Sequence, residues 1–167
     1  MIEIARLYAK KAHTDVNQKY HDQSYVYHLQ MVVTIAHQYI DLIPEEDKDE
    51  VIAGCWVHDV IEDTGQTYND VKRNTNEVVA EYAYALTNEK GRTRKDRANK
   101  KYYKGIKEYK HAIFIKLCDR FANSKYSKEH GSSMFKQYQK EMHFFKLHLY
   151  DMRYQILWDD LTKYTLK

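Results

Sequence analysis

Proline and glycine are scarce in this chain, and their scarcity limits the possible folds. The 167 residues contain a single Pro and five Gly. A β-rich fold with many tight turns draws on both residue types, so such a fold is disfavoured. The frequent Lys, Glu, Gln, Ala, Met and Leu residues are instead good helix formers. We therefore expect an all-α protein.

Cysteine, net charge and long apolar runs are also limited. Cys55 and Cys118 both lie in apolar segments, as reduced core thiols of cytosolic proteins do. The formal net charge of +3 is too small to indicate a nucleic-acid partner. There is no apolar run of membrane-spanning length and no N-terminal signal pattern. We expect a cytoplasmic protein that binds neither membrane nor nucleic acid, with its oligomeric state left open.

Apolar residues recur at spacings of three and four along most of the chain, which is the pattern of amphipathic helices. The polar segment 14–24 has no period and is predicted to be a loop. Segment 112–122 fits a buried helix better than a buried strand. The length favours one domain over residues 1–167. The helices are predicted at about 2–13, 25–40, 44–63, 68–73, 76–86, 112–122 and 133–154, with a last short element at 156–161.

An unusual cluster of ionisable residues interrupts the apolar run of the third predicted helix. His58, Asp59, Glu62 and Asp63 fall within six residues. Helical spacing places His58 beside Glu62 and Asp59 beside Asp63, because residues four apart share a face. Burying four such groups costs free energy unless something neutralises them. A divalent metal ion would do so.

Isolated His-Asp pairs arise by chance, and His21-Asp22, in the predicted loop, is assigned no role. Two further polar residues interrupt apolar helices, namely His28 and Asp119. Each has an ordinary explanation: a hydrogen-bonded core histidine, and an ion-pair partner of Lys116 or Arg120. Together with His58 and Asp59, however, they supply two nitrogen and two oxygen donors. Such a set suits Mn²⁺, Fe²⁺ or Zn²⁺ with positions left open for water or substrate.

The order of these residues resembles the HD-domain metal-dependent phosphohydrolases, an all-helical superfamily. Within it, the sequence is most similar to the small RelA/SpoT-type alarmone hydrolases, which carry HDxxEDT and KLxDRxxN blocks. The chain has both, as His58-Asp59-Val60-Ile61-Glu62-Asp63-Thr64 and Lys116-Leu117-Cys118-Asp119-Arg120-Phe121-Ala122-Asn123. It also has Tyr25-Val26-Tyr27-His28 and Leu86-Thr87 in the expected order.

The resemblance implies a role for each matching residue. The metal, most often Mn²⁺ in this family, would be bound by His28, His58, Asp59 and Asp119. Glu62 and Asp63 would position and deprotonate the attacking water; the alternative is a solvated helix end. Arg120 would steady a carboxylate. Substrate contacts would come from Lys19 (phosphate), Asn123 (ribose) and Tyr138 (nucleoside), although Tyr138 is equally compatible with a core aromatic.

The implied activity is removal of the 3′-pyrophosphate from guanosine tetra- or pentaphosphate. The chain departs from the family on the substrate side: Gln23-Ser24-Tyr25 replaces Gly-x-Pro-Tyr, and the loop around Lys19 is shorter. Two alternatives therefore remain open, an HD phosphohydrolase acting on another nucleotide and a nucleotide sensor without turnover.

A basic run completes the set of features. Residues 90–104 hold eight Lys or Arg against one acid, Asp96. Such a run is often a solvated face. Because Lys and Arg pair well with phosphate oxygens, a polyphosphate clamp is the second explanation. A nucleic-acid patch is the third, and the small net charge disfavours it.

Overall fold

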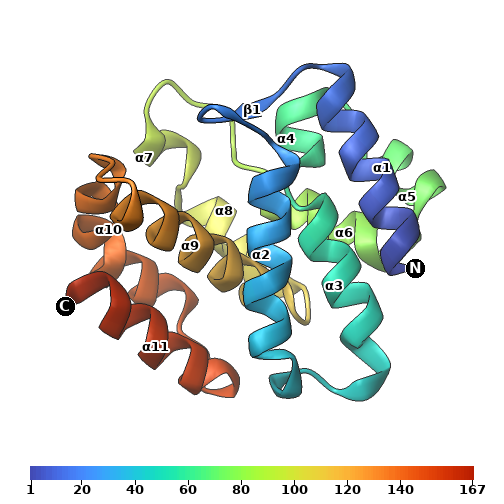
Figure 1. The fold of residues 1–167 in the computed structure, drawn as a ribbon. Helices are drawn as coiled ribbons and strands as arrows, with labels where there is room; N and C mark the ends of the chain where they lie inside the picture. The colour runs from blue at the N-terminus through green and yellow to red at the C-terminus, as the bar shows by residue number, and fades with distance from the viewer.

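The computed structural model describes all residues from Met1 to Lys167, and the prediction of an all-α protein is confirmed (Figure 1). A two-stranded hairpin is its only sheet, with Lys19 opposite Ser24 and Tyr20 opposite Gln23. None of the helices is both long and apolar enough to cross a membrane. The elements are α1 (Ile2–Asp15), β1 (Lys19–Tyr20), β2 (Gln23–Ser24), α2 (Val26–Gln38), η1 (Ile40–Leu42), η2 (Glu45–Asp47), α3 (Lys48–Val57), α4 (Val60–Thr64), α5 (Tyr68–Asn74), α6 (Glu77–Leu86), α7 (Arg94–Arg97), α8 (Lys100–Glu108), α9 (Ala112–Glu129), α10 (Met134–Leu149), η3 (Met152–Tyr154) and α11 (Gln155–Leu166).

Helices α2, α3 and α9 form the centre of the molecule, and the remaining helices pack around them. Helix α2 contacts both α3 and α9, α1 packs on α3, and α10 and α11 pack on α9. In Figure 1 the β1–β2 hairpin lies at the same end of the molecule as α4 and α7. One apolar core of 42 buried residues extends from Ala5 on α1 to Leu161 on α11, so both ends of the chain belong to it.

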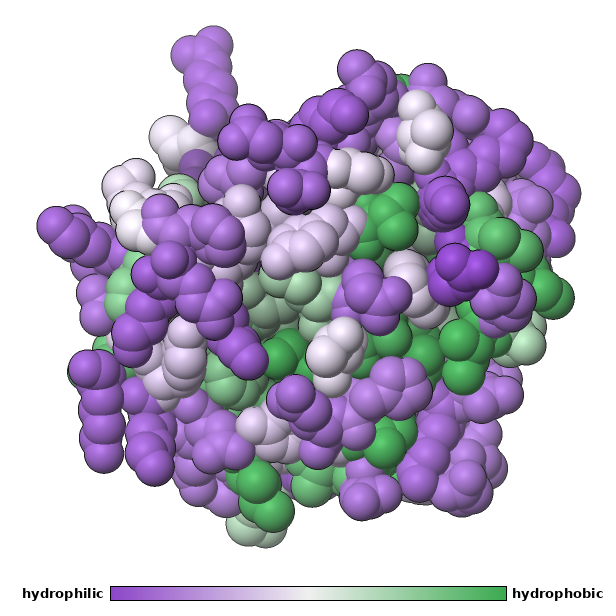
Figure 2. All heavy atoms as spheres, viewed as in Figure 1, coloured by the Kyte–Doolittle hydropathy of each residue, from purple (hydrophilic) through white to green (hydrophobic).

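The surface around this core is mostly charged. Figure 2 shows hydrophilic side chains over most of one face, with smaller apolar patches between them. Short polar side chains cap several helices, as their sequence positions favour. Thr67 and Asp70 form a reciprocal capping box at the start of α5, and Thr93 and Asp96 do the same for α7.

The predicted helix over 44–63 is wrong in its continuity. Helix α3 ends at Val57 and α4 begins at Val60. The ring Nδ1 of His58 donates a hydrogen bond to the carbonyl of Cys55 at 2.8 Å. In a continuous helix that carbonyl would accept from the amide of Asp59. The side chain of His58 thus takes the carbonyl that the next helical turn would need, and α3 ends there. Apolar periodicity does not reveal this competition.

Other boundaries also differ from the prediction. Segment 14–24 contains the hairpin rather than only a loop, and its turn begins at His21, whose φ of 52° lies in the left-handed region. No Asn-Gly or Asp-Gly pair announces this turn in the sequence. Helix α9 continues to Glu129, beyond the predicted end at 122, because Ser124, Tyr126 and Ser127 are buried against its neighbours. Segment 112–122 is helical, which excludes the strand alternative.

Two glycines in helices should respond in opposite ways to substitution by alanine. A Cβ on Gly54 of α3 would lie 2.7 Å from Ile115 Cδ1 and 2.8 Å from Tyr82 Cδ2, whereas a Cβ on Gly105 of α8 would meet nothing within 4 Å. We expect Gly54→Ala to lower the free energy of unfolding by about 1–3 kcal/mol through overpacking. Gly105→Ala should raise it by about 0.5–1 kcal/mol through backbone entropy.

Urea titrations of both variants and the wild-type protein measure these changes. The two substitutions gain the same helix propensity, so the difference between them isolates the steric cost at Gly54. Equal shifts in both variants would show that α3 yields freely to the added methyl group.

Candidate metal centre

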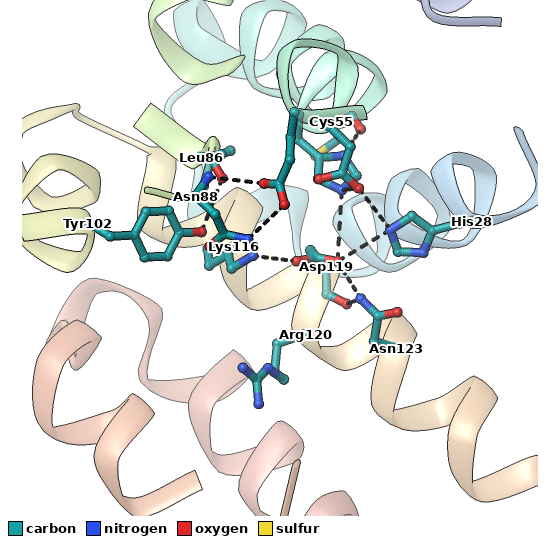
Figure 3. Close-up of polar contacts among 12 residues, drawn as sticks. His28, Cys55, Leu86, Asn88, Tyr102, Lys116, Asp119, Arg120 and Asn123 are labelled. Carbon is teal, nitrogen blue, oxygen red and sulfur yellow. Dashed lines mark hydrogen bonds and ion pairs between the residues drawn. The ribbon is translucent and has the colours of Figure 1, made fainter. Parts of the chain in front are cut away.

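The structure brings together the four predicted metal ligands from three parts of the chain. His28 comes from α2, His58 and Asp59 from the junction of α3 and α4, and Asp119 from α9. Figure 3 shows His28 pointing toward Asp119 across the centre of the cluster. One donor atom each of His28, His58 and Asp119 lies within 4.8 Å of the others. These three side chains are buried.

Asp59 completes this cluster through its Oδ2 atom. That oxygen lies 2.9 Å from His58 Nε2 and 3.6 Å from His28 Nε2. On the other side, Asp119 Oδ1 lies 3.3 Å from His28 Nε2 and 3.8 Å from His58 Nε2. Two nitrogen and two oxygen atoms therefore face one point. We call His28, His58, Asp59 and Asp119 the four-residue centre.

The hydrogen bonding of His58 shows that a cation fits this centre. Its Nδ1 proton is donated to the carbonyl of Cys55, so the neutral form of His58, which binds metals, carries its lone pair on Nε2. That Nε2 atom is buried and has no hydrogen-bond partner of acceptable geometry. A buried acceptor without a partner costs free energy, and a metal ion would remove that cost. A backbone carbonyl that fixes the tautomer is a common support for metal-bound histidine.

The pKa values of the residues in the centre follow from their burial and from the charges beside them. Burial lowers the pKa of His28, but hydrogen bonds and attraction to Asp119 and Asp59 outweigh it and raise the pKa to about 9. Burial raises the pKa of Asp119, but Lys116, His28 and His58 outweigh it and hold the pKa well below its usual range. Burial raises the pKa of Asp59 as well, but His58 and His28 outweigh it and hold that pKa well below its usual range. Both carboxylates thus stay ionised, as metal ligands must.

A shell of hydrogen bonds orients the two carboxylates. The hydroxyl of Tyr25 donates to Asp59 Oδ2 at 2.6 Å. The ammonium of Lys116 donates to Asp119 Oδ2 at 2.8 Å, and the amide of Asn123 donates to Asp119 Oδ1 at 2.5 Å (Figure 3). The motif predicts Lys116 only as an ion-pair partner of Asp119, and this ion pair exists. The partial burial of Lys116 against the centre could not be foreseen from the motif alone.

Glu62 and Asp63 lie on α4 beside the four-residue centre. The sequence predicted that His58 and Glu62 share one face of a continuous helix. This is wrong, because His58 lies in the break between α3 and α4. Glu62 instead accepts hydrogen bonds from the backbone N and the side-chain Nδ2 of Asn88, at 3.0 and 2.9 Å. Asp63 keeps a helical bond to Asp59, from its N to the Asp59 carbonyl at 3.0 Å. Burial raises the pKa of Asp63 to about 7, with Asp59 and Glu62 adding to the effect.

The predicted substrate contacts occupy different environments. Lys19 is exposed on the hairpin. Asn123 is bonded to Asp119 and, through Oδ1, accepts a bond of 2.8 Å from the hydroxyl of Tyr20. Tyr138 is buried, and the guanidinium of Arg120 lies 4.8 Å from its ring centroid. The role of Tyr138 as a nucleoside contact thus stays a prediction beside its core-aromatic alternative.

Arg120 steadies a carboxylate, as predicted, and the partner is Glu141 on α10. Its Nη1 donates to Glu141 Oε2 at 2.9 Å. In Figure 3 the Arg120 side chain points away from the metal-ligand cluster. Arg94 of the basic run donates to the same carboxylate through two nitrogens, at 2.7 and 3.2 Å. Part of the basic run is therefore tied to α10.

Three other residues of the basic run line a surface cavity of about 610 Å³ between α6 and α8, namely Lys90, Lys101 and Lys104. Asn88, the partner of Glu62, lines the same cavity. The pair His21-Asp22, which was assigned no role, lies in the hairpin turn. There the His21 ring stacks on Tyr126 at 4.7 Å between centroids.

His13 is a buried residue near the centre that the sequence analysis did not single out. Its ring stacks on Tyr25 at 4.5 Å, and neither ring nitrogen has a hydrogen-bond partner. The available signal was its place on the buried face of α1 with Ala5, Ala9 and Ala12. A polar residue on a small-residue stripe of this kind marks close helix packing.

Comparison with known proteins gives a structural match but no sequence match. No family model matches the chain. No curated protein matches it either. Among solved structures, the chain is similar to one described as a metazoan ortholog of SpoT that hydrolyses ppGpp and plays a role in starvation responses. The TM-score is 0.69 at 20% identity, over 97% of this chain and 93% of the other. The fold expected from the resemblance is thus the fold observed.

His13 gives a prediction for stability against pH. Burial lowers its pKa from 6.5 to about 4. Between these values the unfolded chain binds a proton that the folded chain does not, so stability is complete above pH 6.5 and is lost as the pH falls toward 4. The loss should be about 2 kcal/mol by pH 4.5.

Urea unfolding of wild type, His13→Phe and the exposed control His37→Gln, at pH 7 and pH 4.5 with a chelator, tests this. The His13→Phe variant keeps a ring for Tyr25 and should lose less stability on acidification. An identical acid loss in wild type and His13→Phe would contradict the prediction.

Metal binding itself is testable without any assay of activity. A ligand at about 100 times its dissociation constant stabilises a folded protein by about 2.7 kcal/mol. For a chain of this size we expect Mn²⁺ to raise the melting temperature by about 5–10 °C. Asp119→Asn should abolish most of this shift, because it removes a charged donor. Asp22→Asn, in the hairpin turn, should keep it, and an equal loss in both variants would argue against the four-residue centre.

Proposed function

We propose that the chain is a metal-dependent phosphohydrolase that removes the 3′-pyrophosphate of guanosine tetra- or pentaphosphate. One observation supports this most: the convergence of His28, His58, Asp59 and Asp119, with Glu62 and Asp63 on the next helix. All of residues 1–167 would serve as one hydrolase domain. The substrate would be a free nucleotide in the cytoplasm, where Cys55 and Cys118 stay reduced.

A divalent ion, for which we propose Mn²⁺, would acidify a water molecule and polarise the phosphate that the water attacks. The two imidazoles and the carboxylates of Asp59 and Asp119 would hold this ion. Their rigidity comes from the bonds that Cys55, Tyr25 and Lys116 supply.

Asp63 is the residue best placed to accept the proton of the attacking water. It lies one turn after Asp59 and is partly buried, and its side chain has a long contact of 3.5 Å with Gln18 Nε2. The hydroxyl of Tyr25 also interacts with the Asp63 carboxylate, but its short bond of 2.6 Å goes to Asp59 Oδ2. The Asp63 carboxylate thus has weaker protein partners than that of Asp59. Glu62 is held by two bonds from Asn88, which suits orienting a water molecule better than moving a proton.

Basic side chains would balance the charge of the phosphates. Lys19 lies on the hairpin, which is at the same end of the molecule as α4 (Figure 1). Lys90 lines the same cavity as Asn88, the partner of Glu62. Lysine binds phosphate as a point charge and needs no fixed geometry, so exposed lysines can serve. Arg94, by contrast, already uses two donors on Glu141.

The choice of an alarmone as substrate rests on the sequence blocks and on the printed activity of the structural neighbour. Turnover of another nucleotide is the runner-up, and a binding module that senses a nucleotide is the rival from another class. The position of Glu62 and Asp63 favours an enzyme, because a pure sensor has no need of a proton acceptor beside its metal ion.

A panel of nucleotides separates these three possibilities. Purified protein with Mn²⁺ should release pyrophosphate from guanosine 3′,5′-bis(diphosphate) and leave guanosine 5′-diphosphate. Release of orthophosphate from 5′-monophosphates would favour the runner-up. Tight binding of the alarmone with no product over hours would favour the sensor.

The role of Asp63 gives the decisive variant. Asp63→Asn keeps the shape of the side chain but cannot accept the proton, so kcat should fall by about 10²–10⁴-fold. The melting-temperature shift with Mn²⁺ should be retained, because Asp63 is not one of the four ligands. Asp22→Asn is the matched control and should keep full activity. Full activity in Asp63→Asn would overturn the proton-acceptor role.

A further inference from the structure

The hairpin places the side chain of Tyr20 directly on the four-residue centre. Its ring stacks on the imidazole of His28, with centroids 4.8 Å apart and planes at 18°. Its hydroxyl donates to Asn123 Oδ1 at 2.8 Å. Tyr126 on α9 meets the edge of the same ring at 4.9 Å. Tyr20 therefore covers one metal ligand and the predicted ribose contact at once.

The orientation of the Asn123 amide follows from its other partner. The Asp119 carboxylate only accepts hydrogen bonds, so the Asn123 group that faces it must be the NH₂. That Nδ2 atom donates to Asp119 Oδ1 at 2.5 Å and to the Asp119 carbonyl at 3.1 Å. The amide oxygen is consequently the end that faces away from the metal ligands. It can only accept, and the hydroxyl of Tyr20 is the donor that it has.

Both ends of the Asn123 amide have protein partners while Tyr20 is in this position. The oxygen is bonded to Tyr20, and both amide hydrogens are directed at Asp119. The oxygen has a second lone pair, but a ligand hydroxyl that takes the place of the Tyr20 hydroxyl must break the Tyr20 bond. A ligand that displaces Tyr20 must bring such a hydroxyl, because a partly buried carbonyl oxygen left without a donor is costly.

We propose that Tyr20 occupies the position of a substrate hydroxyl and that the substrate must exchange with it. Tyr20 is then a specificity-determining residue. It favours ligands with a free sugar hydroxyl and competes against all others. The identity of the ligand as a nucleotide rests on the proposed function; the exchange itself rests on the contacts of Tyr20 and Asn123.

The hairpin allows Tyr20 to move away from Asn123 while Tyr25 stays in place. Only two residue pairs form the ladder, and the turn residues His21 and Asp22 are exposed. Tyr20 is partly buried, whereas Tyr25 at the end of the hairpin is buried and anchored to Asp59. The stack of His21 on Tyr126 holds the turn from outside the centre. Movement of Tyr20 would thus leave the Asp59 support intact.

The variant Tyr20→Phe removes the hydroxyl and keeps the ring on His28. The probe is guanosine 5′-diphosphate, titrated calorimetrically into the Mn²⁺-loaded protein. Because the variant has no competing bond to Asn123, we expect it to bind the probe about three- to tenfold more tightly than wild type. The 2′,3′-dideoxy form should bind wild type at least about threefold more weakly than the probe, because it leaves Asn123 Oδ1 without a donor.

Two controls separate exchange from a general structural effect. Tyr27→Phe alters an exposed tyrosine that meets only the edge of Tyr126, at 6.1 Å, and should leave probe affinity unchanged. The affinity of Tyr20→Phe for Mn²⁺ should equal that of wild type, because the stack on His28 remains. A change in Mn²⁺ affinity equal to the change in probe affinity would overturn the proposal.

The remaining outcomes are also decisive. Unchanged or weaker probe binding by Tyr20→Phe overturns the exchange, as does the absence of probe binding by both proteins. Because the probe is not hydrolysed in the titration, the result is independent of turnover. Tighter binding by Tyr20→Phe without alarmone hydrolysis would keep the exchange and remove the proposed function. Alarmone hydrolysis together with unchanged probe binding by Tyr20→Phe would keep the proposed function and remove the exchange.

Discussion

The buried side chains of His28, His58 and Asp119, with the partly buried Asp59 beside them, are the constraint to which the surrounding structure responds. Charged groups at this depth are costly unless each is paired and hydrogen-bonded. The pairing requires that α2, α9 and the α3–α4 junction meet at fixed distances, with His28 Nε2 3.3 Å from Asp119 Oδ1. The central position of α2, α3 and α9 in the fold follows from that requirement and from the apolar core around it.

The residues around the centre divide the work of holding it. Tyr25 and Lys116 each bond one ligand carboxylate. Cys55 contributes only its carbonyl, yet that bond sets the tautomer of His58 and accompanies the end of α3. The orientation of the His58 ring and the end of α3 thus both involve the hydrogen bond between His58 and Cys55.

The side of the centre that the hairpin covers is built differently. There Tyr20 and Asn123 bond each other, and both are only partly buried. Polar pairs at a surface are easily exchanged for pairs with a ligand, because little desolvation separates the two states. The chain's departures from the family motif, around Lys19 and before His28, fall on this same side.

Much of the fold could be predicted from local pattern. Apolar periodicity located α1, α2, α5, α6 and α10 to within a few residues at most of their ends, since a helix must bury one stripe. It missed α7 and α8, the break at His58, the hairpin at Lys19 to Ser24 and the length of α9. Each of those depends on contacts with residues distant in sequence. The prediction of a buried helix at 112–122 is confirmed, because apolar residues cover this segment except on the face that carries Lys116, Asp119 and Arg120.

The candidate ligands were recognisable because ionisable residues are rare in apolar helices unless they have a functional role. Three of the four, His58, Asp59 and Asp119, also lie in the two sequence blocks. Apart from the ion pair of Lys116 with Asp119, the hydrogen-bond partners around the centre were not recognisable. The partners Tyr25, Asn88 and Tyr20 lie up to 103 residues away from the groups they hold, in the case of Tyr20 and Asn123. The sequence by itself determined the all-α class and the donor set, since both follow from residue type and spacing. Only the tertiary structure decided the orientation of those donors and the cover over Asn123, because hydrogen-bond geometry arises when separate helices meet.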